Sequence, residues 1–441
     1  MEGAQQQFHW RRGVGRAAHS VAELGDQRLL AFEKNLSFIG EMPEKRTFGH
    51  TGLRGNLGSR RLVKSFQCVQ LERRFLQTTS YLFTVLWQVH PLYLSVTDIL
   101  CYGDVSVTDT SSYVKSEVNM NVRVASAETM RAVRFHRFGE PSEVLRMEHV
   151  PVPHPEQGRI RVRVTACALN PADWALCRGL FPGDMPRGIG LDVSGIVDAV
   201  GNGVHGVEVG DAVFGPTDYA RCASAGAADR AVLAHWTLVP ENLSLDQATA
   251  ITLSAETAFR SLESLEVDYG HTVLINGAGT TVGFAAVQLA LSRGARVIAT
   301  AGATHSRKLA ELGALVTNYG QGMVERVNGL AKGDVDLVLD TAPPSGVLAD
   351  LVTIAGGDPK RVLTITDFTA ADALGVRHSF SEGHPPRWDK LGEFAHLASR
   401  GKLYVPIAGV FPLDSWRQAM EVSLSGHARG KLLLKPGMRQ S

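Results

Sequence analysis

The chain has 441 residues, enough for two or three domains with substantial cores, and its 44% hydrophobic and 20% charged residues are ordinary for a soluble globular protein. A formal net charge of +1 gives no indication of a nucleic-acid partner. The five cysteines are scattered without CxxC spacing, which argues against a disulfide framework or a thiolate zinc cluster and favours a reducing, cytoplasmic setting.

Residues 1–129 show no sustained hydrophobic period. The apolar stretch at residues 80–96 is interrupted by Gln88, His90 and Pro91 and is too short for a membrane span, so no membrane partner is expected. We interpret residues 1–129 as a disordered extension or as the result of a start codon placed too early, with a small accessory segment as a third reading. Met130 begins a stretch that reads like a natural protein start.

Residues 130–253 predict a mostly β domain. Alternating apolar residues at 130–135, 159–165 and 193–200 indicate short strands separated by glycine and proline. Three clusters stand out there: ALNPADW at residues 168–174, GIGLDVSG at residues 188–195 and GVEVGDAVFG at residues 206–215.

Residues 273–300 predict a strand, a glycine turn, a helix and a second strand. The turn carries Gly277, Gly279 and Gly283 with the spacing GxGxxxG, which by itself is equally consistent with an ordinary structural turn. A glycine turn that enters a helix exposes backbone N–H groups at the positive end of the helix dipole, a suitable place for a pyrophosphate. We predict that the hydroxyls or amides of Thr280 and Thr281 face that group.

The end of the second strand, at Thr300, distinguishes between the two nicotinamide cofactors. An NAD site has an acid there to bind the ribose 2′-hydroxyl, but no acid appears before Glu311. Ser306, Arg307 and Lys308 follow instead, and such donors suit a 2′-phosphate. The sequence therefore favours NADPH, and a solvated helix start is the alternative interpretation of Arg307 and Lys308.

Three further strands are expected at residues 313–319, 336–340 and 361–366. The second is a continuous apolar run, as in a parallel sheet buried on both faces. Residues that follow these strands, among them Ala342 and Thr366, lie at the carboxyl ends where open α/β sheets bind ligands.

The motifs MRAVRFHRFGEPSEVL, ALNPADW, GLDVSGIVDAVGNGV and VGDAVFG, followed near the end by ARGKLLL, carry a family resemblance. In order and spacing, from about residue 130 to 436, the chain resembles the zinc-independent quinone oxidoreductases of the medium-chain dehydrogenase/reductase superfamily. The resemblance implies an α/β fold: a discontinuous GroES-like β domain at 130–253 and 375–441, and a Rossmann domain with a doubly wound parallel sheet at 254–374. It places the active site between them.

The resemblance also implies site residues. Asn170 would bond a cofactor ribose or a substrate carbonyl, Thr257 would abut the nicotinamide unless it caps a helix at 254–260, and Tyr319 would lie near the adenosine phosphate. The full set expected to bind NADP is Asn170, Thr257, Gly277, Gly279, Thr280, Thr281, Val282, Gly283, Thr300, Ser306, Arg307, Lys308, Tyr319, Ala342 and Thr366.

Departures from the wider superfamily indicate chemistry without a metal. Zinc alcohol dehydrogenases have a His-Glu pair in the second cluster, where this chain has Leu191 and Asp192. We expect Asp192 and Asp173 to be structural carboxylates, Cys177 to be a buried apolar residue, and Trp174 to pack in the core. Related mitochondrial enoyl reductases have a proton-donating tyrosine near Phe181, which has no proton to give.

The expected function is NADPH-dependent hydride transfer to a quinone or an enone, with no metal and with water as the proton source. No side chain is identified as the catalytic acid. The alternatives are an enoyl-thioester reductase and a non-catalytic NADPH-binding protein. Loops at 214–228 and 378–388 would carry the substrate preference, and a homodimer is left open.

Overall fold

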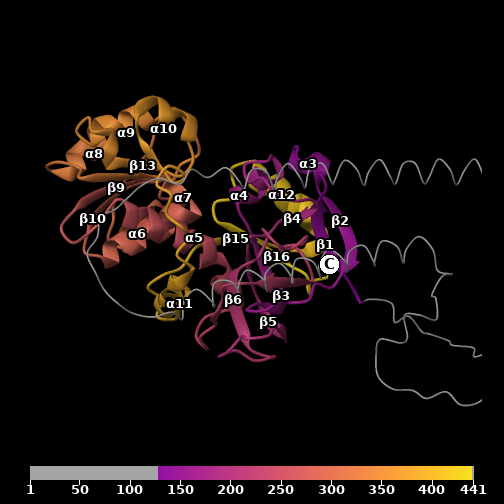
Figure 1. The fold of residues 1–441 in the computed structure, drawn as a ribbon. Coiled ribbons are helices and arrows are strands. Elements are labelled where there is room, and N and C mark those ends of the chain that lie inside the picture. The colour runs from indigo at the N-terminus through magenta and orange to yellow at the C-terminus, as the bar shows by residue number, and fades with distance from the viewer. Residues whose placement is uncertain (1–127, 440–441) are drawn as a thin grey trace, which may run out of the picture. The chain divides into compact units, whose positions relative to one another are not determined.

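The computed structural model describes residues 128–439, so the interpretations of residues 1–127 lie outside it. The described residues belong to one contact unit that contains a β-rich part and a parallel sheet (Figure 1). Within this range, no helix is both long and apolar enough to cross a membrane.

The β-rich part is built from short antiparallel strands, as the alternating apolar pattern predicted. It has a three-stranded sheet in the order β2-β1-β4 and a seven-stranded sheet in the order β15-β16-β3-β5-β6-β8, with β7 also paired to β3. The strands are β1 (Thr129–Phe135), β2 (Arg146–Pro151), β3 (Ile160–Leu169), β4 (Arg187–Gly188), β5 (Asp192–Val200), β6 (Ala212–Pro216), β7 (Arg230–Leu233), β8 (Thr237–Leu238), β15 (Ile407–Pro412) and β16 (Lys431–Lys435).

The last two strands confirm that the β-rich part is discontinuous. Strand β16 pairs antiparallel with β3 and parallel with β15, so a segment some 260 positions later in the chain completes the sheet. Figure 1 shows the yellow β15 and β16 among the purple and magenta strands. Two short helices, α3 (Pro141–Val144) and α4 (Pro171–Cys177), and the later α12 (Trp416–Leu424) accompany these strands. Trp174 on α4 is buried in this core, as expected.

The second sheet has six strands, all parallel, in the order β11-β10-β9-β12-β13-β14. Numbered from its own first strand, this order is 3-2-1-4-5-6, the doubly wound order of dinucleotide-binding folds. The strands are β9 (Thr272–Asn276), β10 (Arg296–Thr300), β11 (Leu315–Thr317), β12 (Leu337–Asp340), β13 (Val362–Thr364) and β14 (Arg377–His378).

Helices cover both faces of this sheet because its strands are apolar on both sides. One core joins the sheet to α5, α6, α7 and α11, and another joins it to α8, α9 and α10. The helices are α5 (Leu245–Ser264), α6 (Thr281–Ser292), α7 (Ala303–Glu311), α8 (Met323–Ala331), α9 (Leu348–Ile354), α10 (Phe368–Leu374) and α11 (Leu391–Ser399).

A helix or a sheet continues across each expected domain boundary. The boundary at 253/254 falls inside α5, a single helix of 20 residues that begins at Leu245, after its N-cap Ser244, and contacts β3, β5 and β6 as well as α6. The boundary at 374/375 falls before β14, which still extends the parallel sheet. Helix α11 also packs in the core of that sheet, so the chain returns to the β-rich part only with β15.

Candidate active site at the carboxyl edge of the parallel sheet

Buried polar side chains close the carboxyl ends of four adjacent strands. Thr300 on β10 donates to Asn276 Oδ1 on β9 over 2.6 Å, and Asn276 Nδ2 donates to Asp340 Oδ1 on β12 over 2.8 Å. Thr364 on β13 donates to the other oxygen of Asp340, also over 2.8 Å. Burial raises the pKa of Asp340 above its ordinary range, and these donors oppose that rise. The chain of bonds fixes the edge on which a ligand would rest.

This ladder corrects the role expected for Thr300. Its hydroxyl is fully buried, donates to Asn276 and accepts from the amide of Gly277 over 3.0 Å, so it holds the glycine turn and does not face a ligand. Asn276 and Asp340 were not predicted as site residues. The available signal was a polar residue at the end of each apolar strand.

Residues that follow β12 and β13 form hydrogen bonds at or beside the glycine turn. Thr341 donates its hydroxyl to the carbonyls of Asn276 and Gly277 over 2.9 and 3.0 Å. Thr366 donates to the carbonyl of Ala342 over 2.6 Å. Ala342 and Thr366 therefore lie at the same edge as the glycine turn, as predicted, while a direct contact with a cofactor stays a prediction.

The three glycines of the turn have different reasons to be glycine. Gly277 has φ +74°, and a Cβ there would lie 2.5 Å from the amide of Ala342; a Cβ on Gly283 would lie 2.4 Å from the carbonyl of Gly277. Glycine is required at these two positions by close contacts within the protein. A Cβ on Gly279 would meet only His305 Cδ2, at 3.6 Å, so this position leaves open space at the turn.

The start of α6 offers unpaired donors. Among the described residues, no acceptor is present for the backbone N–H groups of Gly279, Thr281 and Val282. They lie at the positive end of the α6 dipole, where an anion is stabilised. Thr281 and Val282 thus keep the donors that the sequence predicted for a pyrophosphate.

The polar groups of Thr280 have partners inside the protein, and a contact of Thr280 with a pyrophosphate stays a prediction. Thr280 is the N-cap of α6: its hydroxyl accepts from the amide of Gly283 over 3.0 Å and donates to Thr341 Oγ1 over 3.0 Å. Its own amide donates to the carbonyl of Gly277. Both groups of Thr280 are used inside the protein: the hydroxyl satisfies the first-turn amide of Gly283, and the Thr280 amide closes the glycine turn.

The start of α7 lies beside the end of β10. Gly302 caps the helix, and a Cβ on it would lie 3.6 Å from the hydroxyl of Tyr319, which is 65% exposed. Ser306 lies in the second turn and donates to the carbonyl of Ala303. Ser306 and Tyr319 are thereby placed on the same side of the sheet, beyond β10 and β11.

The predicted cations on α7 are already paired. Arg307 Nε and Lys308 Nζ both contact the carboxylate of Glu311, at 3.0 and 3.4 Å, and the Arg307 side chain is 92% exposed. These contacts lower the pKa of Glu311, so the acid is ionised at neutral pH. From the sequence, Glu311 was considered only as an acid and lies too far along the chain to bind a ribose. Its position one helical turn from Arg307, where it pairs with that cation, was not predicted.

A cation from the β-rich part reaches the same helix. Arg429, in the loop before β16, donates to Thr304 Oγ1 over 2.8 Å, and its carbonyl lies 3.1 Å from His305 Nε2. The two contacts bring the β-rich part against the first turn of α7. Nothing in the local sequence around Arg429 revealed this approach, because the partners are 125 and 124 positions apart.

Asn170 does not present a free amide, contrary to the prediction. It is 4% exposed; its Nδ2 donates to Asp192 Oδ2 over 3.0 Å, and its Oδ1 accepts from Lys431 Nζ over 2.6 Å. Lys431 Nζ also lies 4.0 Å from Asp192. Asp173 accepts from the amides of Asn170 and Gly190 over 2.7 and 2.6 Å. We call Asn170, Asp173, Asp192 and Lys431 the buried polar cluster.

Burial governs the ionisation of this cluster. It raises the pKa of Asp173 to about 7 and that of Asp192 to about 6, and it lowers the pKa of Lys431. Both acids are fully buried and each accepts a hydrogen bond within the protein, so their structural role stays the prediction that these contacts favour. Cys177 is buried as expected, and its pKa is raised to about 12, so it is a thiol at neutral pH.

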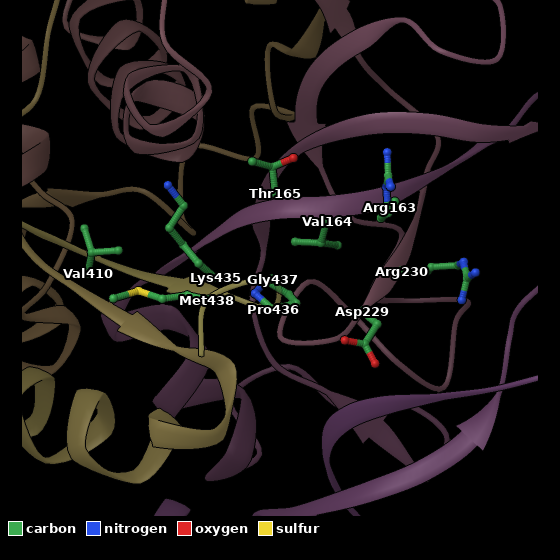
Figure 2. A pocket seen from close by; sticks show the side chains of 10 residues that line it. All are labelled: Arg163, Val164, Thr165, Asp229, Arg230, Val410, Lys435, Pro436, Gly437 and Met438. Atoms are coloured by element: carbon green, nitrogen blue, oxygen red, sulfur yellow. The ribbon is translucent and has the colours of Figure 1, made fainter. Parts of the chain in front are cut away.

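A pocket of 660 Å³ lies in the β-rich part, but it is not the site that the sequence predicts (Figure 2). None of the predicted site residues lines it. Three of its charged residues are engaged elsewhere: Asp229 with Arg131, Arg230 with Asp198, and Lys435 with Asp246. The pocket therefore offers little uncompensated charge for a ligand.

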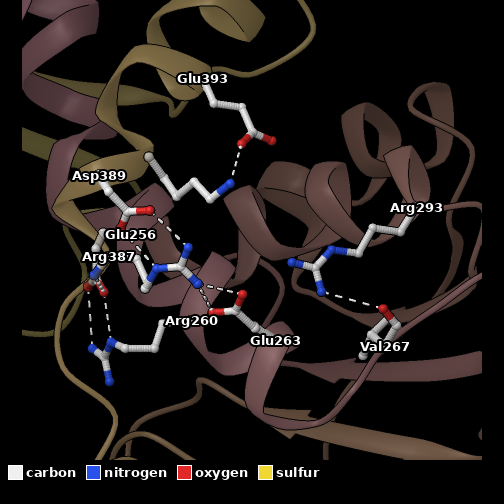
Figure 3. Close-up of polar contacts among 9 residues, drawn as sticks. Glu256, Arg260, Glu263, Val267, Arg293, Arg387, Asp389 and Glu393 are labelled. Atoms are coloured by element: carbon white, nitrogen blue, oxygen red, sulfur yellow. Dashed lines mark hydrogen bonds and ion pairs between the residues drawn. The ribbon is translucent and has the colours of Figure 1, made fainter.

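Thr257 lies in the middle of α5 and not at a helix start, so the capping interpretation is wrong; the N-cap is Ser244. Its neighbour Glu256 is completely buried and binds Arg260 Nε over 2.7 Å and the amide of Arg387 over 3.0 Å. Figure 3 shows this ionic network, in which Arg387 also binds Glu263 and Asp389. The network fastens the segment around residue 387 to α5. A contact of Thr257 with nicotinamide stays a prediction.

Comparison with known proteins assigns families to both parts. Residues 156–245 match the Alcohol dehydrogenase GroES-like domain family and residues 312–434 match the Zinc-binding dehydrogenase family. A solved structure described as an NAD-dependent alcohol dehydrogenase superposes with a TM-score of 0.61 at 28% identity, covering 70% of this chain and all of that one.

Curated relatives give the same assignment. The quinone oxidoreductase of Pongo abelii is 36% identical over 186 residues, which span 41% of this chain and 55% of that protein. The quinone oxidoreductase of Mus musculus is 30% identical over 333 residues, which span 69% of this chain and 97% of that protein. The order of the parallel strands, the glycine turn at α6 and the completed β-rich sheet agree with this likeness. The chain belongs to the quinone oxidoreductase-like group of the medium-chain dehydrogenase/reductase superfamily, whose oxidoreductases use a nicotinamide cofactor.

Proposed function

We propose that this chain is an NADPH-dependent oxidoreductase that transfers a hydride to a quinone or an enone without a metal ion. The observation that carries the proposal is the glycine turn, where the amides of Gly279, Thr281 and Val282 are unpaired and Gly279 leaves open space. These groups would hold the pyrophosphate of the cofactor, which supplies the hydride when bound.

The preference for NADPH is supported by the start of α7. The N-cap there is Gly302, and no acid lies in the first turn of the helix, so nothing repels a 2′-phosphate at this point. The hydroxyl of Tyr319 lies beside Gly302, and Arg307, Lys308 and Arg429 add positive charge nearby. Glu311 offsets part of that charge. NAD is the competing cofactor, in keeping with the NAD-dependent alcohol dehydrogenase to which the fold is similar.

The proposal of a metal-free site is supported by the donor set, although one matching family is described as zinc-binding. Leu191 has no ligand atom, the Asn170 amide is bonded at both ends, and Asp192 lies 4.0 Å from the amine of Lys431. The ammonium group of Lys431, which contacts Asn170 and lies near Asp192, brings a positive charge among these residues and so disfavours a zinc ion. Among the described residues, no cluster of three or more His, Cys, Asp or Glu side chains could hold a metal.

The acceptor is proposed from the same chemistry. Without a metal to polarise an alcohol, hydride transfer to an electron-poor carbon requires mainly proximity and alignment. A quinone or an enone has such a carbon, and water can supply the proton. Phe181 has no proton to give, which counts against an enoyl-thioester reductase of the mitochondrial type, so that activity is the second candidate.

Cofactor oxidation tests the proposal. Purified protein is mixed with NADPH or NADH and with 1,4-benzoquinone, 9,10-phenanthrenequinone, 3-penten-2-one or crotonyl-CoA, and loss of the cofactor absorbance is followed. We expect turnover with NADPH and the quinones or the enone, and the same rate after treatment with a chelator. Turnover with crotonyl-CoA alone would establish the thioester reductase, and tight NADPH binding with no turnover would establish a binding protein.

The cofactor preference needs its own variant. Arg307→Ala with Lys308→Ala should raise KM for NADPH about tenfold and leave KM for NADH within about twofold, because charged partners of a phosphate contribute strong hydrogen bonds. Lys360→Ala with Arg361→Ala, an exposed pair in the 3-10 helix before β13, removes the same two positive charges and is the control. Equal effects on the two cofactors would contradict the assignment.

A further inference from the structure

Three phenylalanines from distant parts of the chain meet beside the cofactor edge. Phe181 comes from the loop between α4 and β4, Phe380 follows β14, and Phe368 opens α10. The rings of Phe181 and Phe380 have centroids 5.7 Å apart at 56°, and those of Phe368 and Phe380 have centroids 4.8 Å apart at 71°. We call these residues the aromatic wall. It joins the β-rich part to the parallel-sheet part.

The position of the wall follows from the strand order. Phe368 lies two residues after Thr366, which follows the carboxyl end of β13 and donates a hydrogen bond to the carbonyl of Ala342. The groups that suit a 2′-phosphate, Tyr319 and the first turn of α7, lie on the opposite side of the turn, after β10 and β11. A dinucleotide that spans this edge with its adenosine at β10 and β11 extends its nicotinamide toward β12 and β13. The aromatic wall thus flanks the nicotinamide half.

The wall is only partly covered. Phe380 is 49% exposed, although a large apolar ring in contact with two other rings is usually buried. Edge-to-face contacts leave ring faces uncovered, and such a face gains from stacking on another flat ring as well as from removal from water. A planar aromatic ligand matches this surface better than a flexible aliphatic one does.

The wall is held in place by ionic contacts. Arg377 binds Glu382 over 2.6 Å and donates to the carbonyl of Ser264 over 2.7 Å, while Ser264 Oγ donates to Glu382 over 2.7 Å. These contacts, on both sides of Phe380 in the chain, lower the pKa of Glu382 to about 2, so they persist through the physiological range. On the other part, Arg187 Nη1 donates to the carbonyl of Phe181. Such fixing reduces the entropy lost when a ligand binds.

We propose that the aromatic wall, and Phe380 in particular, makes this site selective for flat, fused-ring aromatic quinones over acyclic enones. The inference rests on the proposed function and specifies its substrate class. Phe380 and Phe181 are specificity residues: they contact the rings of the acceptor and take no part in the transfer of the hydride. The wall forms only when the two parts of the chain come together.

The test compares acceptors in variants of the wall. Phe380→Ala should raise KM for 9,10-phenanthrenequinone about tenfold, while KM for 3-penten-2-one and the Kd for NADPH stay within about twofold. Phe380→Leu, which retains apolar area without an aromatic face, should give an intermediate effect, and Phe181→Leu should act in the same direction. Tyr269→Ala is the control, because Tyr269 is 83% exposed just before β9, at the opposite edge of the sheet.

Failure of this inference differs from failure of the proposed function. Equal changes in KM for the quinone and the enone in folded Phe380→Ala and Phe380→Leu, or no change in either, would overturn the wall while leaving the reductase intact. Binding of phenanthrenequinone to the NADP⁺-loaded protein, followed by calorimetry, does not require turnover. If no acceptor is reduced but this binding weakens in Phe380→Ala and not in Tyr269→Ala, the wall stands and the reductase assignment falls.

Discussion

The glycine turn at α6 and the buried polar cluster of the β-rich part both lie at strand ends, but they treat their polar groups differently. At the turn, backbone amides of Gly279, Thr281 and Val282 stay unpaired. In the cluster, the side chain of Asn170 is bonded to Asp192 and Lys431, and all three residues are almost completely buried; only Asp192 Oδ1 has no hydrogen-bond partner among the described residues. The first region keeps donors for a ligand, whereas the second uses charge to join strands.

The comparison teaches that a polar residue in a family motif need not be a ligand group. The two regions would respond to mutation in different ways. Changes in the buried polar cluster should act on stability, and changes at the unpaired amides should act on cofactor binding. Variants that separate these two quantities test the distinction.

The largest effect is expected from Lys431→Met. It leaves Asp192 buried without its counterion and Asn170 Oδ1 without a donor, so the free energy of unfolding should fall by about 3 kcal/mol. Lys435→Met, four residues later on the same strand, breaks the partly exposed pair with Asp246 and should cost only about 0.5 kcal/mol. Urea denaturation measures both. Similar losses in the two variants would show that the cluster is not a stability device.

The next largest effect should separate two glycines of one turn. Gly279→Ala should leave the free energy of unfolding nearly unchanged but raise the Kd for NADPH about tenfold or more, since its Cβ fills the space that a pyrophosphate would approach. Gly283→Ala forces a Cβ to 2.4 Å from the Gly277 carbonyl and should cost about 2 kcal/mol of stability. Calorimetric titration and urea unfolding give the two quantities. Unchanged NADPH affinity in Gly279→Ala would refute a pyrophosphate at this turn.

The pH dependence of stability should report the buried acids. Asp173 and Asp192 have pKa values raised to about 7 and about 6, chiefly by burial, above a value of about 4 in the unfolded chain. A carboxyl with a raised folded pKa contributes stability that is complete below the unfolded pKa and is lost as pH rises through the folded pKa. The free energy of unfolding should therefore fall between about pH 4 and pH 7, by more than about 1 kcal/mol.

Asp192→Asn tests the source of that slope. The variant has no carboxyl at this position, so its stability should change less between about pH 4 and pH 6 than that of the parent protein. Urea denaturation across this range compares the two. An identical pH dependence would assign the slope to other groups.

The smallest effect should come from Glu311→Gln on α7. The variant releases Arg307 and Lys308 from their shared carboxylate, so KM for NADPH should fall about twofold to threefold while KM for NADH is unchanged. The result would sharpen the view that Glu311 offsets part of the charge available to a 2′-phosphate. A rise in KM for NADPH would show that Glu311 instead positions the two cations.

The sequence by itself determined the strands, the glycine turn and the two kinds of sheet. The turn residues could be found because the βαβ unit is local: its glycines, its helix and its two strands lie within 28 consecutive positions, from 273 to 300. That unit placed Thr281 and Val282 at the carboxyl edge, and the ends of the later apolar strands placed Ala342 and Thr366 there. The unit also showed that the second strand ends without an acid.

Only the tertiary structure decided which polar groups remain free. Asn170 is engaged by Lys431, 261 positions later in the chain, and the hydroxyls of Thr280 and Thr300 accept from amides of their own glycine turn. Phe181 and Phe380 likewise became neighbours only when the two parts met. A hydrogen bond or a ring contact depends on distance in space, and long-range pairing in a discontinuous β part has no local signature in the chain.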